Sequence, residues 1–264
     1  MFSNVTRFFN EFTSDPVNAL ISLAYLAVCI VFSLVIHECA HGYVALKCGD
    51  PTAKMMGRLT LNPLKHLDPF GTICMIFLRV GWARPVPINP RNFRNYRRDY
   101  ILVSLAGIAV NLAVFLLSLL ISALVAKVMY TPDFVDYVAS QGGKGMLLNI
   151  YRSNVAASAY SGIELFSTGM KAPALLYVER LFLMLAQMNL GLAVFNLIPV
   201  PPLDGYRFVD QFVFKGRLSL NPQTMQMIHI VFLVVCISGA LSGLLGTVNG
   251  AIFGLFSNMM GAVI

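Results

Sequence analysis

Charged side chains are scarce in this sequence. Asp, Glu, Lys and Arg together make up 12% of its 264 residues, whereas they make up about 25% of a typical soluble domain. Hydrophobic residues account for 57%, and the mean hydropathy is +0.72. The stretch from Met225 to Ile264 has no Asp, Glu, Lys or Arg at all. This shortage of charge excludes an ordinary soluble domain and predicts an all-α polytopic membrane protein in a lipid bilayer.

Paired cysteines are also lacking. The five cysteines are scattered, mostly in apolar segments, and none belongs to a CxxC pair: Cys29, Cys39, Cys48, Cys74 and Cys236. An odd number without regular spacing argues against a disulfide framework and against a cysteine-based metal site. We expect these residues to pack as small hydrophobic side chains.

The basic residues are concentrated in one loop. Ten of the nineteen Lys and Arg lie between Lys47 and Arg98. The net charge of +7 is therefore interpreted as a signal of membrane topology, and no nucleic-acid partner is expected. By the positive-inside rule this loop faces the cytoplasm. We expect the N-terminus outside a cell membrane, with the first span running inward to an active site near the cytoplasmic side.

Four apolar segments are long enough to cross a bilayer. The first begins at Asp15 and Pro16, which suit the N-cap and the first position of a helix. The last is long enough for one tilted helix or for two joined at 238–243, so four or five spans are expected. A shorter run at 66–85 is predicted to be re-entrant or interfacial, and 1–15 to form an interfacial helix. The membrane segments are 16–46, 100–129, 173–198 and 225–264, and residues 1–264 are expected to form a single membrane-embedded domain.

The first span contains the sequence HECAH, with His37, Glu38 and His41. Histidines at i and i+4 leave the same helix face, so both imidazoles can bind one ion, while Glu38 is turned about 100° away. This HExxH pattern is typical of zinc metalloproteases, in which two neutral imidazoles bind the metal and the free carboxylate is the general base. Chance is disfavoured because ionisable residues inside an apolar helix are costly. We expect one Zn²⁺ per chain.

A third protein ligand must come from elsewhere, because catalytic zinc sites use three protein ligands and keep one position for water. His229 stands alone on an apolar segment, where a structural role is the simpler interpretation. His66 and Asp68 lie in a loop that could approach the site, although turn formation explains them equally well. Asp204 follows the third span on a proline-rich turn, and the predicted topology brings it to the depth of the two histidines. Asp204 is the favoured candidate.

Four motifs together resemble the site-2 protease family of intramembrane zinc metalloproteases. They are HECAH on the first span, GRLTLNPLKHLDPFGT in the following loop, SLAGIAVN on the second span and NLIPVPPLDG after the third. The resemblance implies that His37, His41 and Asp204 are the zinc ligands and that Glu38 is the catalytic acid/base. A compact form is expected, without the PDZ or CBS domain of many members.

Two asparagines also match the family motifs. The resemblance implies that Asn196, in the proline motif, binds the extended backbone of a substrate. Asn111, in the SLAGIAVN motif, is a second candidate for substrate binding, and helix packing is the alternative.

The predicted activity is hydrolysis of a peptide bond within a transmembrane helix of a substrate protein, as in regulated intramembrane proteolysis. The alternatives are an inactive zinc-binding protein that clamps partner helices, a zinc transporter, and a protease that acts on exposed peptides. A transporter is disfavoured because the ionisable residues cluster at one depth, and an inactive homologue because Glu38 is intact. The sequence predicts neither the identity of the substrate nor the oligomeric state.

Overall fold

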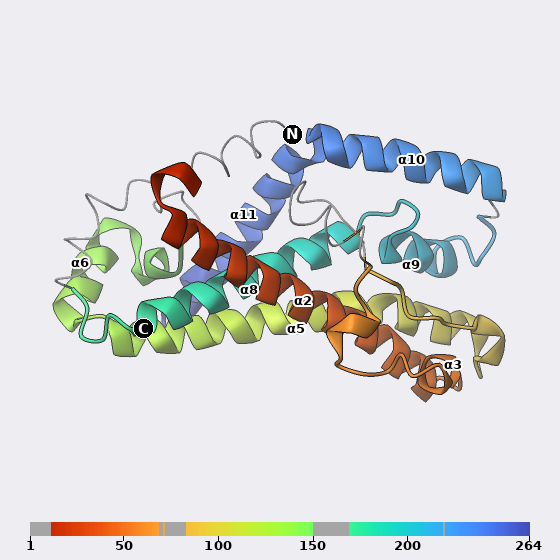
Figure 1. The fold of residues 1–264 in the computed structure, drawn as a ribbon, viewed down its shortest axis with the longest axis horizontal. Coiled ribbons are helices and arrows are strands. Elements are labelled where there is room, and N and C mark those ends of the chain that lie inside the picture. The colour runs from red at the N-terminus through yellow and green to blue at the C-terminus, as the bar shows by residue number, and fades with distance from the viewer. Residues whose placement is uncertain (1–11, 69–70, 72–82, 150–168, 219) are drawn as a thin grey trace. The chain divides into compact units, whose positions relative to one another are not determined.

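The computed structural model describes residues 12–68, 71, 83–149, 169–218 and 220–264 (Figure 1). The described residues form helices joined by turns, and their only extended pairings are two isolated bridges, Leu67 with Ala83 and Tyr130 with Met170. The helices are α2 (Pro16–Lys47), α3 (Thr52–Met55), α5 (Tyr96–Met129), α6 (Pro132–Gly142), α8 (Leu175–Asn196), α9 (Asp204–Phe212), α10 (Pro222–Ser238) and α11 (Ala240–Met260), and the short 3₁₀ turns are η1 (Pro63–Lys65), η2 (Pro90–Asn92) and η3 (Lys144–Asn149).

Four described helices, α2, α5, α8 and α11, are long and apolar enough to cross a membrane. Helix α10 is apolar too, but its 17 residues fall short of the roughly 20 that a span needs. The predicted segment 225–264 is two helices rather than one, because Gly239 ends α10 with a left-handed φ of 79°. The prediction of an all-α polytopic membrane protein is confirmed.

Helix α2 begins where the sequence predicted. The side chain of Asp15 accepts a hydrogen bond of 3.1 Å from Asn18 N, and Pro16 is the first helical residue. Such a cap satisfies one of the N–H groups that the first turn leaves unpaired. The predicted interfacial helix at 1–15 and the re-entrant segment at 66–85 lie largely outside the described residues, and both stay predictions.

The chain divides into two compact units. One comprises residues 1–112 and 191–246, and the other comprises residues 113–190 and 247–264. The first unit contains α2, α9, α10 and the N-terminal part of α5, and the predicted metal ligands all belong to it. The expectation of a single domain stays a prediction, since two compact units can belong to one domain or to two.

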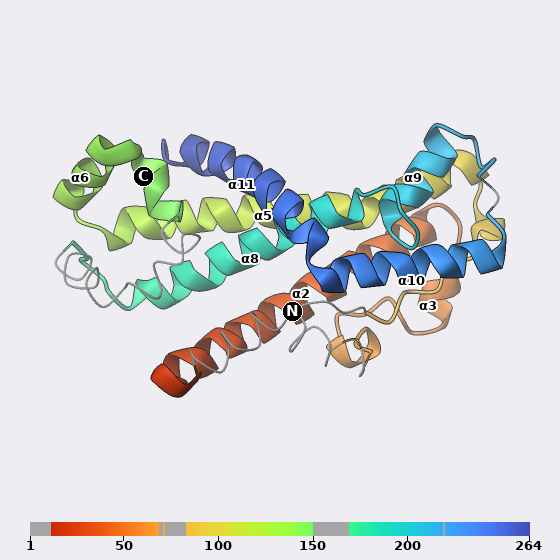
Figure 2. The same ribbon diagram turned by 90° about the horizontal axis from the view of Figure 1, so that it is seen from above.

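The second unit contains the one acidic residue that interrupts the third apolar segment. The C-terminal part of α5 runs beside the N-terminal part of α8 in both views (Figures 1 and 2). Glu179 on α8 is fully buried there. Tyr130 Oη donates to its carboxylate and Ser122 Oγ to its backbone carbonyl, both at 3.5 Å. Of these two hydroxyl groups, only that of Tyr130 contacts the acid itself, and Glu179 Oε1 is buried without a hydrogen-bond partner among the described residues.

In the first unit, the Asp50 side chain links separate parts of the loop that follows α2 through hydrogen bonds. Its buried carboxylate accepts hydrogen bonds from Asn89 N at 2.7 Å and from Asn92 Nδ2 at 2.8 Å. It also accepts from Thr52 N at 3.1 Å and from the Thr52 hydroxyl. Burial raises the pKa of Asp50, but these four hydrogen bonds outweigh it and lower the pKa below its ordinary value of 3.8. The ionised carboxylate therefore stabilises this loop.

Asp50→Asn tests this network. The asparagine side chain has nearly the same size, but its NH₂ group would face the N–H groups that now donate to Asp50. We therefore expect the unfolding free energy in detergent to fall by about 2–3 kcal/mol. Because the folded pKa of Asp50 is lowered, the carboxylate stabilises the parent protein above the unfolded pKa and ceases to do so as pH falls through the folded pKa. Thermal unfolding near pH 7 and near pH 3 should therefore show a smaller difference between variant and parent at pH 3. An equal difference at both pH values, or no greater loss than in the exposed control Asp136→Asn, would contradict the assignment.

Candidate metal centre

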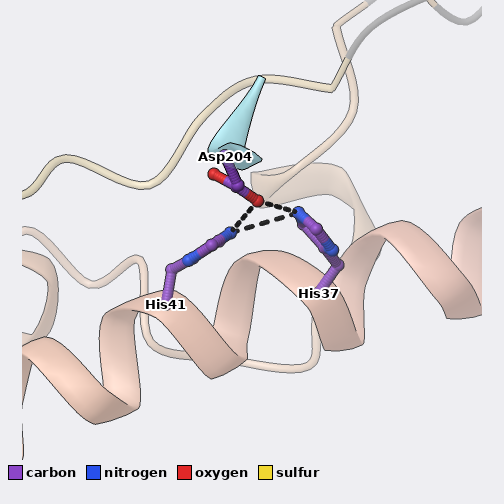
Figure 3. A group of neighbouring side chains, drawn as sticks. All are labelled: His37, His41 and Asp204. Atoms are coloured by element: carbon purple, nitrogen blue, oxygen red, sulfur yellow. Dashed lines mark hydrogen bonds and ion pairs between the residues drawn. The ribbon is translucent and has the colours of Figure 1, made fainter. Parts of the chain in front are cut away.

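Three predicted ligands meet at one point in the first unit. His37 and His41 project from α2, and Asp204 projects from the first residue of α9 (Figure 3). His37 Nε2 and His41 Nε2 lie 3.1 Å apart. Asp204 Oδ2 lies 3.3 Å from the first of these nitrogens and 3.1 Å from the second. All three residues are buried, and among the described residues they form the one group of this kind that could hold a metal ion.

Helix α5 supports both imidazole rings with residues four apart. Val103 O lies 2.7 Å from His41 Nδ1, and Asn111 Nδ2 lies 3.1 Å from His37 Nδ1. Between them, a Cβ added to Gly107 would come within 3.0 Å of both rings. Residues at i, i+4 and i+8 lie along one helix face. The backbone of Gly107 and its two neighbours on this face therefore form the floor of the site.

The end of α8 and the start of α9 bring Asp204 to the histidines. Helix α8 ends at Asn196, and the turn NLIPVPPL, with a cis bond between Pro201 and Pro202, leads to Asp204. A Cβ at Gly205 would lie within 3.0 Å of the backbone at Leu197, so only glycine allows α9 to begin this close to α8.

The three facing atoms suit a cation. A carbonyl oxygen only accepts hydrogen bonds, so His41 carries its proton on Nδ1 toward Val103, and its Nε2 presents a lone pair. That lone pair faces Asp204 Oδ2, which is also an acceptor. Tetrahedral zinc with bonds of about 2.0–2.1 Å places its ligands about 3.3 Å apart. The observed separations of 3.1, 3.1 and 3.3 Å agree with that spacing.

If His37, like His41, uses Nε2 to bind a metal, the donor and the acceptor in its contact with Asn111 are defined. Its Nδ1 then carries a proton and needs an acceptor. A 180° rotation of the Asn111 amide, which exchanges its oxygen and nitrogen, provides one. In the present orientation Asn111 Oδ1 is buried without a hydrogen-bond partner. Asn111 can therefore orient His37 as Val103 orients His41.

Glu38 lies apart from the three ligand atoms, as the helical spacing predicted. It is half-buried, and its Oε2 accepts a hydrogen bond of 2.8 Å from Val86 N. The loop that contains Val86 therefore contacts the Glu38 side chain from outside α2. Because Glu38 does not belong to the group of three ligand atoms, its carboxylate is available for proton transfer.

The other candidate ligands, and Asn196, which was predicted to bind substrate, lie elsewhere in the described chain. His66 is buried, with Nε2 at 2.8 Å from Thr60 O. Asp68 accepts from Gly71 N at 2.8 Å, which is a turn interaction. His229 is exposed on α10. Asn196 lies at the end of α8, where Nδ2 donates to Leu192 O at 3.0 Å. None of these four belongs to the group of three facing ligand atoms.

Sequence reasoning missed three backbone groups that shape this site: the Val103 carbonyl, the Gly107 Cα and the Val86 amide. A signal for Gly107 was present, since it lies four residues before Asn111 on the second span. The Val86 amide left a weaker signal in the sequence RPVPI, where prolines flank a single donor.

Comparison with known proteins identifies the family. The sequence model of peptidase family M50 matches residues 25–239, a range that includes the two histidines, Glu38 and Asp204. No solved structure matches the chain.

Curated relatives agree with this match. The chain is 38% identical to the "Putative zinc metalloprotease YwhC" of Bacillus subtilis, over 82% of this chain and 81% of the relative. It is 26% identical to Rip2 of Mycobacterium tuberculosis, which carries the same description, over 88% of this chain and 74% of the relative. With four candidate membrane helices, the chain belongs to peptidase family M50 and is an intramembrane zinc metalloprotease.

Proposed function

We propose that His37, His41 and Asp204 bind the zinc ion and that Glu38 is the catalytic acid/base for hydrolysis of a peptide bond within a transmembrane segment of a membrane protein. The observation that carries this proposal is the convergence of His37 Nε2, His41 Nε2 and Asp204 Oδ2 within 3.3 Å of one another, with Glu38 next to His37 in the sequence. An inactive clamp or a zinc transporter is not favoured, because the family is one of peptidases and Glu38 is intact.

Zinc, when bound, supplies a Lewis acid that polarises the scissile carbonyl and lowers the pKa of water. The chain's own residues do the rest. Val103 and Asn111 orient the rings of His41 and His37, so that both Nε2 atoms face Asp204. Glu38 takes a proton from the attacking water and delivers it to the leaving amine. The predicted role of Asn111 in substrate binding stays a prediction beside this orienting role.

A substrate helix hides its carbonyl groups, so it must unwind near the cleaved bond. Asn196 carries both a donor and an acceptor, which suits it to hold an extended backbone. Its Nδ2 now bonds to Leu192 O within its own helix, a contact that a substrate carbonyl can replace. This makes Asn196 the proposed substrate-binding residue.

The proposed orientation rests on the Lys/Arg-rich loop between α2 and α5. We propose that this loop lies in the cytoplasm of a cell whose plasma membrane holds the protein, with the N-terminus outside. Because α2 ends at Lys47, His41 is about 9 Å of helix rise from that end. The active site then lies within the bilayer, nearer the cytoplasm, in a single membrane-embedded domain.

The ligand set can be tested by zinc content. Purified parent protein should carry about one zinc per chain, and Asp204→Ala should lose most of it because two histidines alone make an incomplete site. Glu38→Gln, which leaves the ligands untouched, should keep its zinc. Gly107→Ala should also lose zinc, since its methyl group would displace both rings. Elemental analysis of folded protein measures all three, and full zinc in Asp204→Ala would remove that residue from the site.

Membrane topology can be tested with single cysteines placed near Asn95 and near Gln141 in a cysteine-free background. Helix α5 lies between these positions, so we expect labelling from opposite sides of the membrane, with Asn95 reached from the cytoplasm. Impermeant thiol reagents on intact cells and on inverted vesicles measure this. Labelling of both positions from one side would contradict the proposed orientation.

Cleavage of a co-reconstituted substrate helix tests the catalytic roles. Glu38→Gln should lower kcat roughly 10²- to 10⁴-fold, because general-base assistance is lost while zinc remains. Asn196→Ala should have a smaller defect. That defect should shrink further when Gly or Pro near the cleaved bond weakens the substrate helix, since unwinding then costs less. Cleavage by Glu38→Gln at the parent rate would overturn the assignment of Glu38.

A further inference from the structure

The extended segment at residues 84–88 lies against α2 and presents one amide to Glu38. Val86 N donates to Glu38 Oε2 at 2.8 Å. Proline has no N–H, so in the sequence RPVPI Val86 supplies the only amide proton between Arg84 and Ile88. The Val86 side chain is 6% exposed and lies over Gly42, one helical turn after Glu38. The segment is therefore seated on α2 at the turn that carries Glu38.

Arg58 binds the other side of the same peptide group. Its Nη2 donates to Pro85 O at 3.2 Å and to Arg84 O at 2.7 Å. The Pro85 carbonyl and the Val86 N–H belong to one planar peptide unit. That unit thus lies between a guanidinium at its oxygen and a carboxylate at its N–H. A cation at the carbonyl polarises the peptide in the direction that makes its N–H a stronger donor.

The segment is also anchored beyond Val86. Asp50 accepts hydrogen bonds from Asn89 N and Asn92 Nδ2. Arg58, which is only 8% exposed, holds one end of the segment, and Asp50 holds the other. With both ends held, the position of the Val86 amide is set by the loop rather than by Glu38.

A glutamate on a helix surface has several rotamers, and proton transfer needs one of them. Among the described residues, Val86 N is the hydrogen-bond donor to the Glu38 carboxylate. We propose that Arg58 is a positioning residue, which acts through the Pro85–Val86 peptide group to hold the carboxylate of Glu38 in place for proton transfer. This inference rests on the proposed role of Glu38 as acid/base.

Amide hydrogen exchange tests the contact without reference to activity. In a peptic peptide that spans Pro85 and ends at Pro87, Val86 provides the last exchangeable amide. The measurement does not need activity, so zinc-free protein can be used. We expect slow exchange in the parent and exchange about 10-fold faster or more in Glu38→Ala and in Arg58→Met. The exposed control Arg91→Met should match the parent. Unchanged exchange at Val86 in both test variants would overturn the proposal.

Kinetics test the consequence. Arg58→Met should lower kcat by about 10- to 100-fold, because misplacement of a catalytic group by about 1 Å has effects of this size. KM, zinc content and melting temperature should stay near the parent values. Arg58→Lys keeps the charge and should recover part of the loss. A kcat loss that Arg58→Lys does not reduce, or one matched by loss of zinc or of folded protein, would mean a merely structural role.

Combination with Glu38→Asp separates this inference from the proposed function. The shorter aspartate cannot reach the Val86 amide, so Arg58→Met should cost little more in that background. A full additional loss would show that Arg58 does not act through residue 38 and would overturn the inference while Glu38 remains the base. If Glu38→Gln instead cleaves at the parent rate, the proposed role of Glu38 is wrong, and the proposed positioning role of Arg58 is wrong with it.

Discussion

The hydrogen bond between His41 Nδ1 and the Val103 carbonyl, 2.7 Å long, is the interaction on which the proposed metal centre depends. It joins the first and second predicted spans at the depth of the site. It also decides which nitrogen of His41 is free, because the carbonyl can only accept. With Nδ1 engaged, Nε2 must face inward, toward His37 and Asp204. The orientation of a proposed zinc ligand is thus set by the backbone of a neighbouring helix.

Two glycines allow the close approaches that this arrangement requires. At Gly107 the α5 backbone touches both imidazole rings, and at Gly205 the start of α9 touches the end of α8. Either approach would be blocked by a Cβ. The buried polar groups of the first unit are likewise held by backbone atoms, such as Val86 N for Glu38 and Asn89 N for Asp50. In a low-dielectric environment, such fixed dipoles replace the water that would otherwise solvate these charges.

Much of the fold could be predicted from the sequence, because hydropathy and helix caps are local signals. The first span was predicted as 16–46 and is Pro16–Lys47, and the third was predicted as 173–198 and is Leu175–Asn196. The division of 225–264 was left open, since a glycine within an apolar run can lie inside a helix or end it. Only the left-handed backbone at Gly239 distinguishes the two.

The candidate site was predictable to the extent that side-chain chemistry marks it. The HExxH motif predicted His37, Glu38 and His41, and the LDG turn predicted Asp204. The structure brings the three proposed ligands together. Backbone groups carry no such mark, since every residue has a carbonyl and almost every residue has an amide. The role of the Val103 carbonyl therefore emerges only from its tertiary contact with His41, 62 residues away, and the role of the Val86 amide mainly from its contact with Glu38, 48 residues away.

Zinc K-edge X-ray absorption of the purified parent protein and of Asp204→Asn reports on the identity of the zinc ligands. If His37, His41 and Asp204 bind the zinc, the parent protein should show only nitrogen and oxygen neighbours at about 2.0–2.1 Å, with the multiple scattering of two imidazoles, and any zinc that Asp204→Asn retains should have a changed first shell. A sulfur neighbour at about 2.3 Å, or a first shell unaltered by Asp204→Asn, would contradict this ligand set.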